Sequence, residues 1–189
     1  PVVVGQIYKG ASLRYIDRNA NGVSSIRYDF ISLFSAIRYK DDVVLLLGVS
    51  GAIALPLVRL VSKIKVVTNI DGIEWKREKW GRMASAFLRF SEYLAVRFSH
   101  RVLADNEGIA EHVLQSYGQE CDVIAYGGDH AVQLDGNLVE IDLPKNYMLG
   151  LCRIEPENNV ALILESFSRT PVHNLVFIGN WASSDFGKS

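Results

Sequence analysis

Polar segments, most of them containing glycine, follow the apolar runs of this sequence, and their residue types are those of a ligand-binding cleft. They are residues 48–51, 69–77, 105–108, 125–129, 153–159 and 180–181. In open α/β sheets ligands bind at the carboxyl ends of the strands, so these segments are expected to meet at one edge of a sheet. Each segment taken alone is also typical of an ordinary turn.

The segment 69–77 carries the side chains best suited to chemistry. Asp71 and Glu74 are carboxylates that can bind hydroxyl groups or act as a general base when correctly placed. Asp71 could instead cap the following helix or form an Asx-turn, and both interpretations stay open. Trp75 and Trp80 stand next to lysine and arginine, and aromatic faces beside cations suit a sugar or a lipid diphosphate headgroup.

Composition and charge exclude several other classes of protein. Apolar residues make up 49% of the 189 residues, which is typical of a globular chain. A formal net charge of −1 lacks the overall positive charge of a nucleic-acid binder. Cys121 and Cys152 are predicted to be buried free thiols in a reducing cytoplasm, and the scattered histidines have no ligand spacing, so no metal site is expected. The longest apolar tract, residues 43–58, is shorter than the ~20 residues of a membrane span.

Apolar runs and helical periodicity alternate along the first two thirds of the chain. Strands are predicted at 2–8, 43–47, 65–68, 101–104 and 122–124, and helices at 26–39, 52–62, 79–98 and 107–117. This order predicts a Rossmann-like, doubly wound parallel α/β sheet. The run 43–47 is continuously apolar, which predicts a strand buried on both faces.

The regular alternation of predicted strands and helices ends after residue 128. Residues 1–128 are therefore predicted to form one domain, 129–145 a linker, and 146–189 the start of a second domain. The second part contains a predicted strand at 147–151, a helix at 160–168 and a strand at 175–179. A single βαβ unit buries too little surface to be a domain, so we expect this second domain to be incomplete.

Four strings carry a resemblance to a known family. They are NIDGIEWKREKWG at 69–81, DNEGI at 105–109, YGGD at 126–129 and RIEPENN at 153–159. With them, the chain resembles a bacterial rhamnosyltransferase-like subfamily that is similar to glycosyltransferase family 4, the retaining, nucleotide-sugar-dependent GT-B enzymes. The resemblance runs from about residue 28 to residue 179, and the first string is its most specific part.

The resemblance implies two Rossmann-like domains, with the acceptor mainly on the first and the nucleotide-sugar on the second. It also implies a glycine-rich opening strand and a later segment with paired glutamates. Neither stands in these residues, so we expect an internal fragment of a glycosyltransferase that is inactive alone. The implied reaction moves a sugar, with rhamnose as one candidate, from a nucleotide-sugar donor to a lipid-linked or saccharide acceptor in cell-surface polysaccharide synthesis. No cofactor is implied.

Site roles follow by matching these strings. The predicted catalytic residues are Asp71 and Glu74. The predicted donor-binding residues are Arg153, Glu157, Asn158, Asn159 and Gly179, with the two asparagines near the place where the wider family has a lysine. The predicted acceptor-binding residues are Gly48, Ser50, Asn69, Gly72, Trp75, Lys76, Arg77, Asp105, Asn106, Tyr126, Gly127 and Gly128. Arg153 suits a diphosphate because its guanidinium donors form a fork, although it could also cap a helix or pair with a neighbouring glutamate.

Two alternatives stay open. The basic amphipathic helix predicted at 79–98 can lie on anionic lipid, which would place a cytoplasmic protein at the periphery of the inner membrane, or it can pack on the sheet with a solvated charged face. The second alternative concerns function. Instead of an enzyme, the chain could be a non-catalytic Rossmann-like module that binds a nucleotide or a partner protein.

Overall fold

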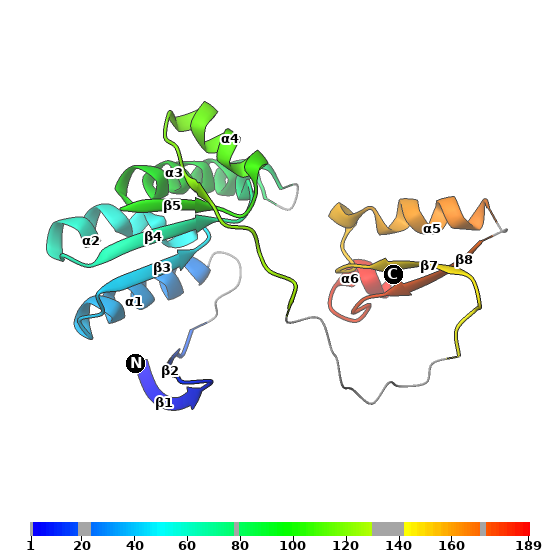
Figure 1. Cartoon of the computed structure of the whole chain (residues 1–189), viewed down its shortest axis with the longest axis horizontal. Helices are drawn as coiled ribbons and strands as arrows, with labels where there is room; N and C mark the ends of the chain where they lie inside the picture. Colours follow the sequence, from blue (N-terminus) through cyan, green and yellow to red (C-terminus); the bar gives the residue numbers. More distant parts are fainter. Residues whose placement is uncertain (1, 19–23, 78–79, 130–141, 171–172) are drawn as a thin grey trace. The chain divides into compact units, whose positions relative to one another are not determined.

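The computed structural model describes residues 2–18, 24–77, 80–129, 142–170 and 173–189 (Figure 1). The chain divides into two compact units, Pro1–Gly128 and Asp129–Ser189, which are described separately. Most of the predicted linker 129–145 lies outside the described residues, as does the first residue of the helix predicted at 79–98.

The first unit is built on a four-stranded parallel sheet with the order β3-β4-β5-β6. The strands are β3 Val43–Leu47, β4 Lys65–Ile70, β5 Arg101–Ala104 and β6 Asp122–Val123. The helices are α1 Ser24–Arg38, α2 Leu55–Val61, α3 Arg82–Phe98 and α4 Glu107–Tyr117, with short 3-10 turns η1 Ser50–Ala54 and η2 Glu74–Lys76. Strand and helix alternate from α1 to β6, which confirms the predicted Rossmann-like α/β class.

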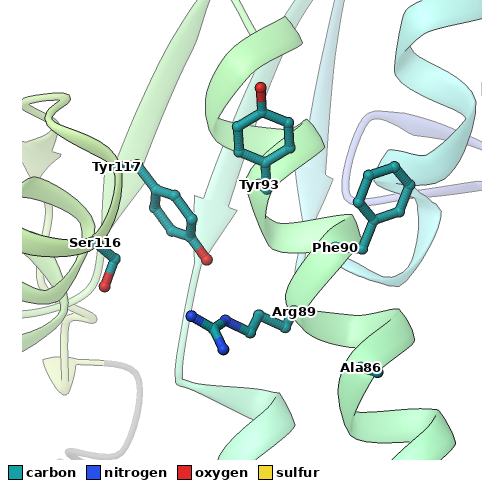
Figure 2. Close-up of a pocket in the computed structure, with 6 residues that line it drawn as sticks. All are labelled: Ala86, Arg89, Phe90, Tyr93, Ser116 and Tyr117. Atoms are coloured by element: carbon teal, nitrogen blue, oxygen red, sulfur yellow. The ribbon is translucent and has the colours of Figure 1, made fainter.

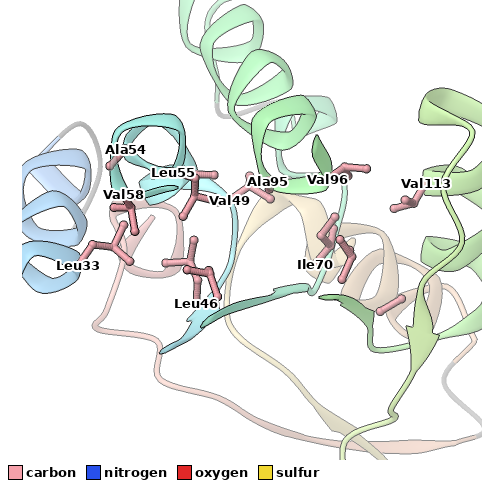
Figure 3. Close-up of a cluster of buried hydrophobic side chains, with 14 of the residues drawn as sticks. Leu33, Leu46, Val49, Ala54, Leu55, Val58, Ile70, Ala95, Val96 and Val113 are labelled. Atoms are coloured by element: carbon pink, nitrogen blue, oxygen red, sulfur yellow. The ribbon is translucent and has the colours of Figure 1, made fainter. Parts of the chain in front are cut away.

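One apolar core joins this sheet to its helices. Leu46 and Ile70 of the strands belong to the same buried cluster as Leu55 and Val113 of the helices (Figure 3). Each fully buried side chain of this size stabilises the fold by about 1.5–3 kcal/mol. Each strand of the sheet lies beside the strand that precedes it in the chain. Because the connections between parallel strands are right-handed, connections that all lead in the same direction place their helices on the same face of the sheet.

The opposite face of β3 is exposed, so the prediction that this strand is buried on both faces is wrong. Val43 is 58% exposed, Leu45 is 55% and Leu47 is 70%. The five apolar residues do form a strand, but β3 stands at the edge of the described sheet. Of these residues, only Val44 and Leu46 pack against the core formed with the helices. Periodicity alone does not reveal which neighbours cover a strand.

The N-terminal residues form a hairpin outside the parallel sheet. β1 Val2–Tyr8 pairs antiparallel with β2 Ala11–Ile16 across a turn at Lys9 and Gly10, both of which have positive φ. The sequence prediction placed a strand at 2–8 but missed β2 and this pairing. The signal was available, because a glycine in a two-residue turn between apolar runs is typical of a hairpin. Arg14 on β2 donates two hydrogen bonds, of 2.7 and 2.8 Å, to the carboxylate of Asp41, three residues after α1.

The second unit contains a parallel strand pair connected by a helix. β7 Tyr147–Leu151 pairs with β8 Asn174–Ile178, and α5 Val160–Ser168 lies between them in the chain. The bounds of β7 and α5 are those predicted from the sequence, and β8 begins one residue earlier than predicted. A short helix, α6 Asp185–Lys188, follows and was not predicted.

Candidate functional site

The carboxyl ends of the four parallel strands bring the predicted polar segments of the first unit to one edge. Leu47 lies opposite Asn69, Ile70 opposite Ala104, and Ala104 opposite Val123. The segments after these strands therefore leave the sheet side by side. Topology places the predicted catalytic residues and most of the predicted acceptor-binding residues together at this edge.

Asp71 stands directly after β4 and has a perturbed carboxyl group. Partial desolvation raises its pKa above the ordinary value, and the neighbouring carboxylates of Glu74 and Asp105 raise it further. The hydrogen bond from its own backbone N–H and the positive charge of Arg77 act in the opposite direction. Asp71 remains an exposed residue, so this carboxyl is reachable and more basic than usual, which are the two properties of a general base.

Glu74 is more tightly held than Asp71. Arg77 donates a 2.6 Å hydrogen bond to Glu74 Oε1, and Trp80 Nε1 donates one of 3.4 Å to Glu74 Oε2. The two donors fix the carboxylate within the turn that begins at η2. Glu74 is therefore better suited to shaping the loop and keeping Arg77 in place than to taking a proton.

Trp75 is anchored by a buried carboxylate on α3. Its indole Nε1 donates a 3.3 Å hydrogen bond to Oε1 of Glu92, a residue with 0% exposure. His112 Nε2 and Tyr117 Oη, both on α4, contact the same oxygen at 2.8 and 2.6 Å. Glu92 thus connects the loop after β4 to two helices, while its Oε2 has no hydrogen-bond partner among the described residues.

Two cations lie against the Trp75 ring, and they give this part of the site a positive charge. Lys76 Nζ is 5.3 Å and Arg89 Cζ 5.2 Å from the ring centroid. Lys76 was a predicted acceptor-binding residue, whereas Arg89, Glu92, His112 and Tyr117 were not singled out as site residues. A carboxylate at a position that faces the sheet, within an otherwise apolar helical face, is the signal that could have revealed Glu92.

Several predicted acceptor-binding residues have structural partners. Asn106 caps α4, since its Oδ1 accepts a 3.0 Å hydrogen bond from the backbone N–H of Ile109, and its Nδ2 donates to Asp105 Oδ1 at 2.7 Å. Asn69 belongs to β4 rather than to the loop where the sequence prediction placed it. It is buried, and its Nδ2 donates a 3.0 Å hydrogen bond to Tyr126 Oη. These contacts position the loops, and they leave Tyr126 itself 70% exposed at the edge.

The predicted glycines differ in their backbone requirements. Gly48 has φ +85°, a conformation that favours glycine at the turn after β3. Gly72, Gly127 and Gly128 have no positive φ, and a Cβ at any of them would meet no atom within 4 Å. The backbone thus requires glycine only at the first of these positions, and the other three leave open space beside the chain.

A further carboxylate, Asp29, was missed by the sequence analysis. Ser50 Oγ donates a 2.5 Å hydrogen bond to Asp29 Oδ2, which links α1 to the turn after β3. Burial raises the pKa of Asp29, and the hydrogen bond from Ser50 partly offsets this rise. A Cβ at Gly51 would lie 2.6 Å from Asp29 Cβ, so glycine is required there for close packing. The clue in the sequence was an acidic residue within the otherwise apolar pattern of the predicted helix.

In the second unit, the predicted donor-binding residues follow β7 and β8. Arg153 is 73% exposed and pairs with Glu157 at 3.9 Å, and Asn158 Nδ2 donates a 2.7 Å hydrogen bond to the Arg153 carbonyl. Asn159 has φ +54° at the start of α5. A Cβ at Gly179 would meet the carbonyl of Cys152 at 2.7 Å and would overlap Ile154, so this glycine is required for packing of the strand ends.

The residues of α3 divide between the core and the surface. Leu88, Leu94 and Ala95 are buried, so the helix packs on the sheet as one of the two sequence interpretations expected. Met83 and Phe90 of the same helix are instead 88% and 52% exposed. Among the described residues, none of the helices has the length and apolar character to cross a membrane, and no cluster of His, Cys, Asp or Glu could hold a metal ion.

The fold and this edge define a Rossmann-like α/β protein with an acidic and aromatic site at the carboxyl ends of its parallel strands. More particularly, the chain belongs to the family described as domain of unknown function DUF1972, which matches residues 8–129. That match covers the whole parallel sheet and the site beside it. Comparison with curated proteins gives no match.

Proposed function

We propose that this protein is a glycosyltransferase that moves a sugar from a nucleotide-sugar to a lipid-linked or saccharide acceptor in cell-surface polysaccharide synthesis. The observation that carries the proposal is Asp71, an exposed carboxylate with a raised pKa beside the paired Glu74 and Arg77 and next to the anchored Trp75. The resemblance of residues 69–81 to sugar transferases supports the same assignment.

Asp71 would accept a hydrogen bond from the acceptor hydroxyl and take its proton as the acceptor oxygen bonds to the sugar, while the bond between the sugar and the diphosphate breaks and the nucleoside diphosphate leaves. A raised pKa favours this role, because a stronger base removes a hydroxyl proton more readily. The Trp75 ring would pack against a saccharide, and the Lys76 ammonium beside it would attract a phosphate group of a lipid-linked acceptor. Glu74 would hold Arg77 and so maintain the shape of the loop.

The donor would be held by the second unit. Arg153 is largely exposed, and its 3.9 Å contact with Glu157 is long enough to be exchanged for a stronger one. A diphosphate offers such an exchange, because a guanidinium can donate two parallel hydrogen bonds to phosphate oxygens. Asn158 and Asn159 would add amide donors but no charge.

Transfer is tested with a panel of nucleotide-sugars, including a rhamnose donor, each mixed with the purified full-length protein and with lipid-linked or free saccharide acceptors. Mass spectrometry of the acceptor is expected to show the added sugar for at least one donor, and Asp71→Asn is expected to abolish most of it. Binding of a nucleotide-sugar without transfer to any acceptor would instead favour a nucleotide-binding module. Absence of both binding and transfer would contradict the proposal.

A further inference from the structure

A groove of about 600 Å³ lies between α3 and α4, and Arg89 is the residue that it shares with the surroundings of Trp75. Figure 2 shows Arg89 and Tyr93 of α3 across from Tyr117 of α4, with the Arg89 guanidinium extended toward α4 below the Tyr117 hydroxyl. The volume lies within the range of small-molecule sites, roughly 300–1,000 Å³. The groove is lined by Ala86, Arg89, Phe90, Tyr93, Ser116 and Tyr117.

Arg89 is the charged residue among those that line this groove. Its guanidinium lies 5.2 Å from the centroid of the Trp75 ring and interacts electrostatically with Tyr117, and none of the described residues forms a hydrogen bond or an ion pair with it. The acidic residue of α3, Glu92, is buried, and its Oε1 already accepts hydrogen bonds from Trp75 and Tyr117. The exposed guanidinium therefore retains its hydrogen-bond donors for an anion.

Aromatic rings supply the apolar wall beside this cation. The rings of Phe90 and Tyr93 are stacked with centroids 6.4 Å apart, and the Tyr93 and Tyr117 rings are 6.2 Å apart. Phe90 is 52% and Tyr93 45% exposed, so both keep surface for a ligand. Tyr117 donates its hydroxyl proton to Glu92 and therefore presents its ring to the groove rather than a free donor.

We propose that the groove binds a phosphate monoester with an aromatic or aliphatic body. The phosphate lies at Arg89, whose forked donors match two phosphate oxygens, and the body packs against Phe90, Tyr93 and Tyr117. The Ser116 hydroxyl, which also borders the groove, can donate a further hydrogen bond to the phosphate. From Ala86 to Tyr93 the groove follows about two turns of α3, roughly 10 Å, which fits one such molecule.

This inference goes beyond the proposed sugar transfer and does not depend on it. A ligand at Arg89 competes with the Trp75 ring for the guanidinium, and Trp75 belongs to the loop that carries Asp71. A ligand bound in the groove would therefore also change the surroundings of Trp75 at the carboxyl edge of the sheet.

The test uses 1-naphthyl phosphate as the probe and isothermal titration calorimetry as the measurement. Two matched probes separate the parts of the ligand: 1-naphthol lacks the anion, and inorganic phosphate lacks the apolar body. The proposal expects 1-naphthyl phosphate to bind at least about tenfold more tightly than either, since a charge-assisted hydrogen bond contributes on that scale. Equal binding of either fragment, or no binding of the complete probe, would overturn it.

Variants locate the binding in the groove. Arg89→Gln is expected to weaken 1-naphthyl phosphate binding by about tenfold or more, and Arg89→Lys to restore part of it, because lysine keeps the charge without the fork. Ala86→Phe, which fills the groove and leaves Arg89 in place, should block the probe independently. Arg82→Gln is the matched control, an exposed arginine of the same helix outside the groove. Unchanged affinity in both groove variants, or an equal loss in the control, would overturn the proposal.

Discussion

The Trp75 indole donates a 3.3 Å hydrogen bond to Glu92, so the loop that carries the candidate base is attached to a fully buried carboxylate on α3. The loop after β4 is therefore not an independent surface segment. Its position depends on how α3 and α4 pack, because His112 and Tyr117 of α4 contact the same Glu92 oxygen.

Replacement of Asp71 by Asn in the full-length protein should cut sugar transfer by about 10²–10⁴-fold, the range typical of a general acid–base group. Asn keeps the shape and the turn-forming ability of Asp but loses the charge and the basicity. The melting temperature should change little, because Asp71 is exposed. Initial rates and thermal melts on the same preparations test both points. Turnover equal to that of the parent would remove Asp71 from the site and direct attention to Glu74.

Replacement of Arg153 by Ala in the full-length protein should weaken nucleotide-sugar binding by about 1.5–3 kcal/mol, the contribution of hydrogen bonds to a charged group. Calorimetric titration of the donor measures the effect. Arg169→Ala is a suitable control, because Arg169 is likewise exposed and pairs with a glutamate of its own unit at 2.5 Å. If both variants lose affinity equally, or neither does, Arg153 has no specific part in donor binding.

Replacement of Glu92 by Ala should lower the free energy of unfolding by about 3–5 kcal/mol, the scale on which breaking a buried charged contact destabilises a protein. The change leaves the Trp75, His112 and Tyr117 groups without their shared acceptor. Glu92→Gln should lower the free energy of unfolding by less, since the glutamine amide oxygen can still accept a hydrogen bond. Urea unfolding followed by circular dichroism gives these values. Glu111→Ala, at an exposed position of α4, should stay within about 0.5 kcal/mol. A similarly small effect for Glu92→Ala would argue against this anchor.

Asp29 should make stability depend on pH. Burial raises its pKa in the folded protein, so the folded state binds this proton more tightly than the unfolded state does. The contribution of Asp29 to stability is therefore full below its unfolded pKa and is lost as pH rises through the raised, folded pKa. Asn at this position can still accept the hydrogen bond from Ser50.

The Asp29→Asn variant should accordingly be at least as stable as the parent at pH 7, and it should lack the stability that the parent gains as the pH falls through the raised pKa of Asp29 toward the ordinary value of 3.8. Denaturant titrations of both proteins at several pH values measure the difference. Identical pH profiles would mean that Asp29 is not desolvated in the folded protein.

Local sequence signals predicted several elements closely. The helix at 107–117 was predicted with the bounds it has in the structure, because Asn106 caps its start and Gly118 adopts φ +68° at its end. The edge where the polar segments gather was also predictable, since parallel strands end together. Asp71, Glu74 and Asp105 all belong to segments that were predicted to meet at this edge, and the negative charges of Glu74 and Asp105 contribute to the raised pKa of Asp71.

The sequence by itself thus determined the α/β class, most of the elements and the edge that carries the candidate site, because propensity, caps and apolar periodicity act over a few residues. Only the tertiary structure decided which residues meet across long separations in the chain. It exposed one face of β3, paired β1 with β2, joined Ser50 to Asp29 and brought Trp75, His112 and Tyr117 to one oxygen of Glu92. Those contacts depend on strand order and on the packing of helices against each other, which no local pattern encodes.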